Sequence, residues 1–167
     1  TLRSSFANQG QICLCSSRIL IQDKLYDRFK NALVEKVQRI RIGDPTDAAS
    51  KMGAVVSQAH RDKILSSIKS AKEAGGKILC GGEAAEAPNE RCRNGYFVQP
   101  TIIEGLGPSC EINQEEVFGP VITLQSFQTE EEAIQLANDS QYGLAATIWT
   151  QDIAKAHRTA AAIESGI

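Results

Sequence analysis

Two stretches of the chain repeat apolar residues every three or four positions, which is the spacing of a helix that packs one face on a core. The first stretch covers residues 23–42 and repeats Tyr26, Phe29, Leu33, Val37 and Ile40. A Gly-Asp-Pro sequence at 43–45 then ends this helix. The second helix begins near Ser57, a good N-cap residue, and ends at Gly75 and Gly76.

Short β-rich segments alternate with helices along the chain. Two further helices are expected over 129–137, which opens with a Thr-Glu-Glu-Glu capping box, and over 152–164. The expected strands cover residues 17–21, 77–80, 96–103, 121–127 and 144–149. This order of elements predicts an α/β fold with a largely parallel sheet flanked by helices.

Several segments are expected to lack regular structure. Residues 83–95 are polar and turn-rich and should form a loop, while Pro100 places the strand over 96–103 at a sheet edge or a bulge. Residues 1–6 contain no start of an element, and residues 164–167 stop where a glycine would end the last helix. Both ends look cut, so we expect these 167 residues to be a fragment of a longer protein.

Composition excludes several classes of function. The chain contains 18 Lys and Arg and 20 Asp and Glu, which gives a net charge of −2. Nucleic acid is therefore not an expected partner. No apolar run approaches the roughly 20 residues that cross a bilayer, so no membrane partner is expected either. Five cysteines without framework spacing and only two histidines favour neither a disulfide scaffold nor a metal site. A reducing, cytoplasmic location is the simplest expectation.

The segment 6–13 carries the clearest candidate chemistry and reads Phe-Ala-Asn-Gln-Gly-Gln-Ile-Cys. Gly10 would let the backbone approach a ligand closely, and backbone N–H groups would lie beside the Cys13 thiol. A thiolate in such a place is a nucleophile, which is typical of covalent thiol catalysis. By composition alone, however, a cysteine between Ile12 and Leu14 is more often a small core residue. Both interpretations stay open on these residues.

The segment 6–13 resembles the active-cysteine signature of the aldehyde dehydrogenase superfamily. Other segments agree in the same order, namely Gly-Asp-Pro at 43–45, Gly-Tyr-Phe at 95–97 with Pro-Thr at 100–101, Glu-Glu-Val-Phe-Gly-Pro-Val at 115–121, Asn138, and Tyr-Gly-Leu-Ala-Ala at 142–146. The resemblance covers essentially the whole chain. It implies that residues 1–167 form a partial catalytic domain of a longer aldehyde dehydrogenase whose nucleotide-binding domain is absent here.

This resemblance implies NAD(P)-dependent oxidation of an aldehyde to a carboxylic acid, with NAD as the cofactor and NADP possible. Cys13 would be the catalytic nucleophile, forming a thiohemiacetal and then a thioester, and its backbone N–H would be one oxyanion donor. Glu116 would hold the nicotinamide ribose hydroxyls and Phe118 would pack against the nicotinamide ring. Ile12 and Leu14 would line the substrate pocket. Without the Phe-Gly-Pro at 118–120, the neighbouring glutamates would indicate an exposed acidic turn.

The other residues of the cysteine segment are expected to support it. Asn8, Gln9 and Gln11 should brace the loop through hydrogen bonds to the backbone. Cys15 could be a resolving thiol for Cys13, but a link between positions so close in sequence is strained, which favours a packing role.

The chain also departs from the family pattern. The family's general base and the oxyanion-hole Asn lie outside it, so we expect the isolated chain neither to bind NAD measurably nor to oxidise aldehydes. The alternative is a non-catalytic scaffold or assembly fragment of such an enzyme, which in its full form is expected to be a homo-oligomer. A Cys/His hydrolase would need His60 or His157 beside Cys13, whereas both are expected on solvated helix faces. Residues 12–18 and 52–54 are most similar to the 2-aminomuconic semialdehyde dehydrogenase branch.

Overall fold

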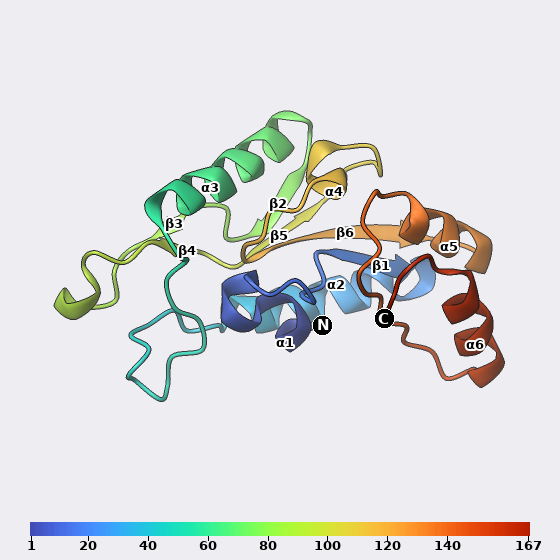
Figure 1. The fold of residues 1–167 in the computed structure, drawn as a ribbon, viewed down its shortest axis with the longest axis horizontal. Coiled ribbons are helices and arrows are strands. Elements are labelled where there is room, and N and C mark those ends of the chain that lie inside the picture. Colours follow the sequence, from blue (N-terminus) through green and yellow to red (C-terminus); the bar gives the residue numbers. More distant parts are fainter.

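The computed structural model describes all 167 residues, which form an α/β fold around a four-stranded sheet (Figure 1). The strands lie in the order β1 (Arg18–Gln22), β6 (Val121–Phe127), β5 (Thr101–Glu104) and β2 (Lys77–Cys80). β6 is parallel to both β1 and β5, and only β2 is antiparallel to its neighbour β5. The predicted fold, with a largely parallel sheet flanked by helices, is confirmed.

The two long helices cover opposite faces of this sheet, with α3 (Gln58–Glu73) above it and α2 (Asp23–Gln38) below it in Figure 1. Successive residues of a strand point to opposite faces, and β5 shows the consequence. Ile102 packs in a cluster with Val37 of α2, whereas Ile103 packs in another cluster with Ile64 of α3. All four side chains are fully buried, and each contributes roughly 1.5–3 kcal/mol through its burial.

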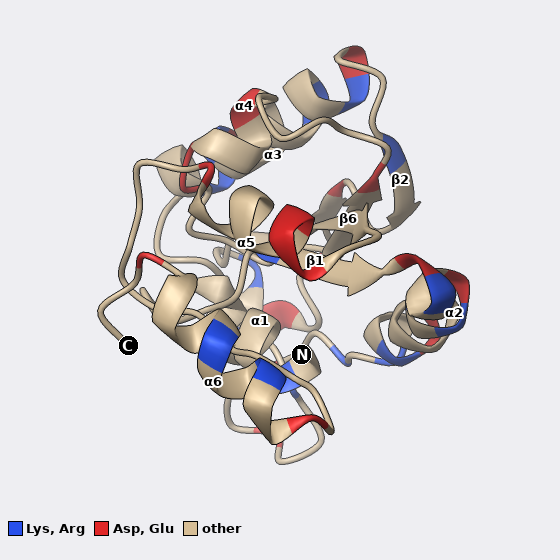
Figure 2. Cartoon of the chain, turned by 90° about the vertical axis from the view of Figure 1, so that its right-hand side faces the viewer, with Lys and Arg blue, Asp and Glu red and all other residues tan.

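The helix starts follow the expected capping. The Ser57 hydroxyl accepts a hydrogen bond from the backbone N–H of His60, and Thr129 accepts one from Glu132. α5 (Glu130–Asn138) opens with three glutamates, which interact favourably with the positive end of the helix dipole (Figure 2). The last helix, α6 (Ile153–Ala162), is capped by Asp152. None of the helices combines the length and the apolar character needed to cross a bilayer.

The predicted strand over 96–103 is wrong in extent, because Pro100 divides it. Pro100 has no N–H to donate, and the chain on either side joins two different sheets. β4 (Phe97–Val98) pairs with β3 (Ala84–Ala85), which lies in the segment expected to be a loop, and β5 joins the main sheet. The same segment also contains the short 3-10 helix Glu90–Cys92.

Two other expectations are wrong. Residues 144–149 form no strand, because their backbone finds partners only at Ile167, through hydrogen bonds at Leu144 and Ala146. Residues 1–6, expected to start no element, instead form α1 (Leu2–Phe6), followed by the 3-10 helix Ala7–Gly10. Phe6 is buried in the cluster that joins α2 to the sheet, so tertiary packing stabilises a helix too short to be stable alone.

Asp44 connects two surface loops through a nearly buried carboxylate. Its oxygens accept hydrogen bonds from the backbone N–H and hydroxyl of Thr46, from the Asn89 amide and from the Arg91 guanidinium. The bonds from Thr46 contribute most, and with that from Asn89 they hold the pKa of Asp44 well below its ordinary value.

We expect Asp44→Asn to destabilise the protein at neutral pH, since asparagine cannot replace the carboxylate as a double acceptor. Because the pKa of Asp44 is depressed in the folded state, the ionised carboxylate stabilises the fold at pH values above the ordinary Asp pKa of 3.8. This stabilisation is lost progressively as the pH falls below 3.8. The difference in urea midpoint between wild type and variant should therefore be constant from pH 7 to 5 and shrink toward pH 3. Asp62→Asn, which removes an exposed carboxylate of α3, is the control. A difference independent of pH would contradict this role for Asp44.

Candidate active site

The Cys13 thiol lies on an exposed turn between the 3-10 helix Ala7–Gly10 and β1. The turn is closed by the hydrogen bond from Cys15 N–H to the Ile12 carbonyl, with an N to O distance of 2.8 Å. Neither the thiol nor the backbone N–H of Cys13 has a hydrogen-bond partner in the chain. A nucleophile and an N–H donor are thus available side by side. Ile12 and Leu14 flank the thiol and are 38% and 51% exposed.

The amide side chains of the loop attach it to the segment before α3. The Gln9 amide donates to the Ala54 carbonyl at 2.9 Å and accepts from the Gly53 N–H at 3.2 Å. The Gln11 side chain accepts from the Val56 N–H at 3.0 Å. The predicted bracing by Gln9 and Gln11 is confirmed, and Asn8 adds a bond to the Gln11 carbonyl.

Three consecutive left-handed residues turn the chain just before Cys13. Asn8, Gln9 and Gly10 have φ values of 48°, 60° and 71°. Gly10 is required for a second reason, because its backbone packs directly on the backbone of Gly119. A Cβ atom at position 10 would lie 2.1 Å from the Gly119 carbonyl oxygen. The Cys13 loop and the Glu-Glu-Val-Phe-Gly-Pro segment, more than 100 residues apart, are therefore in direct contact here.

The second segment, over 115–120, connects α4 (Glu111–Gln114) to β6. Glu116 is exposed, and its carboxylate forms no hydrogen bond or ion pair within the chain. Its backbone is held instead, because the N–H lies 3.4 Å from the Tyr142 hydroxyl and the carbonyl accepts from the Lys63 ammonium at 3.3 Å. Phe118 has a φ of 54° and a partly exposed ring. A free carboxylate and an available aromatic face are thus presented together.

His60 contacts this segment, contrary to its expected place on a solvated face. Its ring Nε2 lies 2.7 Å from the Phe118 carbonyl oxygen, and the two rings meet edge to face at 6.3 Å. His157 is exposed on α6 as expected. Neither histidine forms a hydrogen bond with Cys13, so the geometry lacks the imidazole that a Cys/His hydrolase needs. Sequence reasoning missed the His60 contact because helical spacing says nothing about a partner 58 positions away.

Cys15 is half-buried, and its thiol points to the Ala7 carbonyl at 3.7 Å. Burial raises the pKa of the Cys15 thiol, which disfavours the reactive thiolate and agrees with a packing role. All five cysteines are free thiols. No group of three or more His, Cys, Asp or Glu side chains is placed to hold a metal ion.

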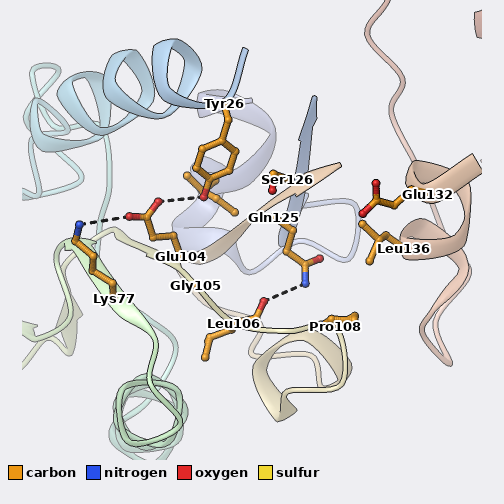
Figure 3. A pocket seen from close by; sticks show the side chains of 11 residues that line it. Tyr26, Lys77, Glu104, Gly105, Leu106, Pro108, Gln125, Ser126, Glu132 and Leu136 are labelled. Atoms are coloured by element: carbon orange, nitrogen blue, oxygen red, sulfur yellow. Dashed lines mark hydrogen bonds and ion pairs between the residues drawn. The ribbon is translucent and has the colours of Figure 1, made fainter. Parts of the chain in front are cut away.

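A hollow of about 460 Å³ lies at the other edge of the sheet, where β5 and β6 end (Figure 3). Glu104 lines it, accepts a hydrogen bond from the Tyr26 hydroxyl at 3.0 Å and forms an ion pair with Lys77 at 3.5 Å. Burial is the main reason that the pKa of Tyr26 rises to about 12. The hollow contains none of the predicted site residues, which lie in the segments that precede β1 and β6.

The whole chain, residues 1–167, matches the family model described as the aldehyde dehydrogenase family. The chain belongs to this family. It is 45% identical to 2-aminomuconic semialdehyde dehydrogenase of Bos taurus and 40% identical to 2-aminomuconic 6-semialdehyde dehydrogenase of Pseudomonas sp. These alignments cover 100% and 99% of this chain but 34% of each relative. The predicted similarity to that branch is confirmed.

Solved structures give the same result for the fold. Betaine aldehyde dehydrogenase of Staphylococcus aureus in complex with NAD+ is similar to this chain with a TM-score of 0.94 and 44% identity. The match covers 99% of this chain and 32% of that one. The chain therefore spans about a third of the length of the relatives it matches.

Proposed function

We propose that this chain carries the nucleophile and part of the cofactor site of an enzyme that oxidises an aldehyde to a carboxylic acid with NAD. The main support is the direct packing of Gly10 on Gly119, which holds an exposed, unpartnered thiol and an unpartnered carboxylate in one region. Proteins of this family named for aldehyde oxidation support the reaction class. A BME-modified cysteine in a related crystal structure supports a reactive thiol in the family.

In the proposed reaction the Cys13 thiol releases its proton to solvent, its sulfur forms a bond to the aldehyde carbon, and the carbonyl π electrons move to oxygen to give the oxyanion of a thiohemiacetal. The unpartnered Cys13 N–H would stabilise the developing oxyanion. Loss of hydride from carbon leaves a thioester on Cys13. Water then breaks the carbon to sulfur bond, which releases the acid and returns the thiol.

Glu116 and Phe118 fit a nicotinamide cofactor. NAD supplies the hydride acceptor when it is bound. The Glu116 carboxylate is free to accept from two ribose hydroxyls at once, and the partly exposed Phe118 ring offers an apolar face to the nicotinamide. Related enzymes crystallised with NAD+ support NAD. The nicotinamide ribose is common to NAD and NADP, so NADP stays possible.

The substrate is proposed to be a small aldehyde that lies against Ile12 and Leu14, the exposed apolar residues beside the thiol. The relatives named for 2-aminomuconic semialdehyde favour an aldehyde of that kind. This activity belongs to the whole protein, which we propose to be a cytoplasmic homo-oligomer. The 167-residue chain alone is proposed to be inactive, and a purely structural or assembly role is the alternative.

We expect Glu116→Gln in the whole enzyme to raise the KM for NAD+ by roughly 10- to 100-fold, the range for losing hydrogen bonds to a charged group. The KM for the aldehyde should change little. Glu115→Gln is a matched control, because the Glu115 carboxylate faces the Tyr142 hydroxyl at 3.5 Å. Steady-state kinetics with each substrate varied would measure both effects. Equal KM values for NAD+ in the Glu116 variant and wild type would refute the cofactor role.

A further inference from the structure

We infer that His60 is a positioning residue that orients Phe118 by holding its backbone carbonyl, an inference that rests on the proposed cofactor site. The distance of 2.7 Å from His60 Nε2 to the Phe118 oxygen is that of a short, well-formed hydrogen bond. A carbonyl oxygen can only accept, so Nε2 must carry the proton. The ring of His60 therefore fixes the direction of the peptide group that follows Phe118.

Phe118 needs such support because its φ of 54° is left-handed, a conformation that residues with a Cβ rarely adopt. The residues that follow are already fixed, since Gly119 packs on Ile64 and Gly10, and the Pro120 carbonyl accepts from Thr101. The bond to His60 is the one contact that holds the Phe118 carbonyl itself. Without it the peptide could rotate, and the ring would leave the position proposed to face the nicotinamide.

The position of His60 is itself determined by the start of α3. Ser57 caps the helix by accepting from the backbone N–H of His60, so the imidazole projects from the first turn. One turn later on the same face, Lys63 donates to the Glu116 carbonyl at 3.3 Å. α3 therefore donates to the carbonyls of both residues proposed to contact the cofactor.

The test uses variants of the whole enzyme. His60→Phe keeps an aromatic ring beside Phe118 but cannot donate, whereas His60→Gln keeps an N–H donor. We expect His60→Phe to raise the KM for NAD+ by roughly three- to tenfold, the range for one lost hydrogen bond, with little change in the KM for aldehyde. His60→Gln should recover most of the loss. Should His60→Phe fail to fold, His60→Asn, whose amide is too short to reach, carries the same expectation.

A second measurement separates positioning from a general loss of stability. Glycine adopts a φ of 54° without support, so in a Phe118→Gly background His60→Phe should cause no further rise in the KM for NAD+. The inference is overturned if His60→Phe leaves that KM unchanged, or if its effect is the same in both backgrounds. If Glu116→Gln also leaves the KM for NAD+ unchanged, the proposed cofactor site itself is wrong. If only the His60 variants leave the KM for NAD+ unchanged, the proposed cofactor site is retained and the positioning role of His60 is rejected.

Discussion

Cys13→Ala should lower aldehyde turnover by the whole enzyme by roughly 10⁴-fold or more, the scale on which loss of a catalytic nucleophile acts. The reason is specific, because alanine cannot form the carbon to sulfur bond on which the proposed thiohemiacetal and thioester depend. Affinity for NAD+ should be nearly unchanged, since Glu116 and Phe118 are untouched. Steady-state turnover and NAD+ binding to the same preparation would show the two effects separately.

Cys15→Ala is the matched control for this experiment. Cys15 lies two positions away on the same turn, but it is half-buried and its thiol already contacts the Ala7 carbonyl. The variant should keep most of the activity, and iodoacetamide should still inactivate it by alkylating Cys13. Near-full turnover in Cys13→Ala would show that the nucleophile is misassigned and would favour the scaffold alternative.

Gly10→Ala should destabilise the protein by roughly 2–5 kcal/mol and disrupt the site at the same time. About 1–2 kcal/mol arises from placing a Cβ on a left-handed residue, and about 1–3 kcal/mol from overlap with a packed neighbour. The neighbour is the Gly119 carbonyl, 2.1 Å from the added atom, and backbone cannot move aside as a flexible side chain can. The Cys13 loop and the segment of Glu116 would be forced apart, so the KM for NAD+ should rise and turnover should fall.

Gly105→Ala separates the two causes. Gly105 has a φ of +85° but nothing within 4 Å of an added Cβ, so this variant carries the backbone cost alone. In thermal and urea unfolding, the Gly10→Ala variant should be much less stable than the Gly105→Ala variant. Activity should be lost only in Gly10→Ala. Equal stability of the two variants would show that the contact between Gly10 and Gly119 does not hold the site together.

The candidate site lies at the amino ends of the parallel strands, which is unusual for this kind of sheet. Ligands of open parallel sheets usually bind outside the carboxyl ends of the strands, where this chain has the hollow around Glu104. Here the thiol precedes β1, and Gly119 and Pro120 directly precede β6. The proposed chemistry therefore lies on loops that precede strands in the chain, not on loops that follow them.

Local information sufficed for features whose causes are local. The apolar repeat of Leu33 and Val37 specifies which face of α2 is buried, and hydroxyl caps such as Ser57 specify where a helix begins, because the groups involved are a few residues apart. The motif around Cys13 is equally local, but the partners of its braces are not, because Gln9 binds Ala54 and Gln11 binds Val56, each 45 positions away.

Tertiary structure alone decided the rest, because it depends on partners distant in sequence. The β-rich segment 144–149 forms no strand without a full set of backbone partners, whereas α1 forms because Phe6 is buried on the sheet. The sequence by itself indicated the residues proposed to act, namely the thiol of Cys13 as nucleophile and the carboxylate of Glu116 as a cofactor contact. Their placement in one site required Gly10 to meet Gly119, a backbone contact between distant segments that no local pattern encodes.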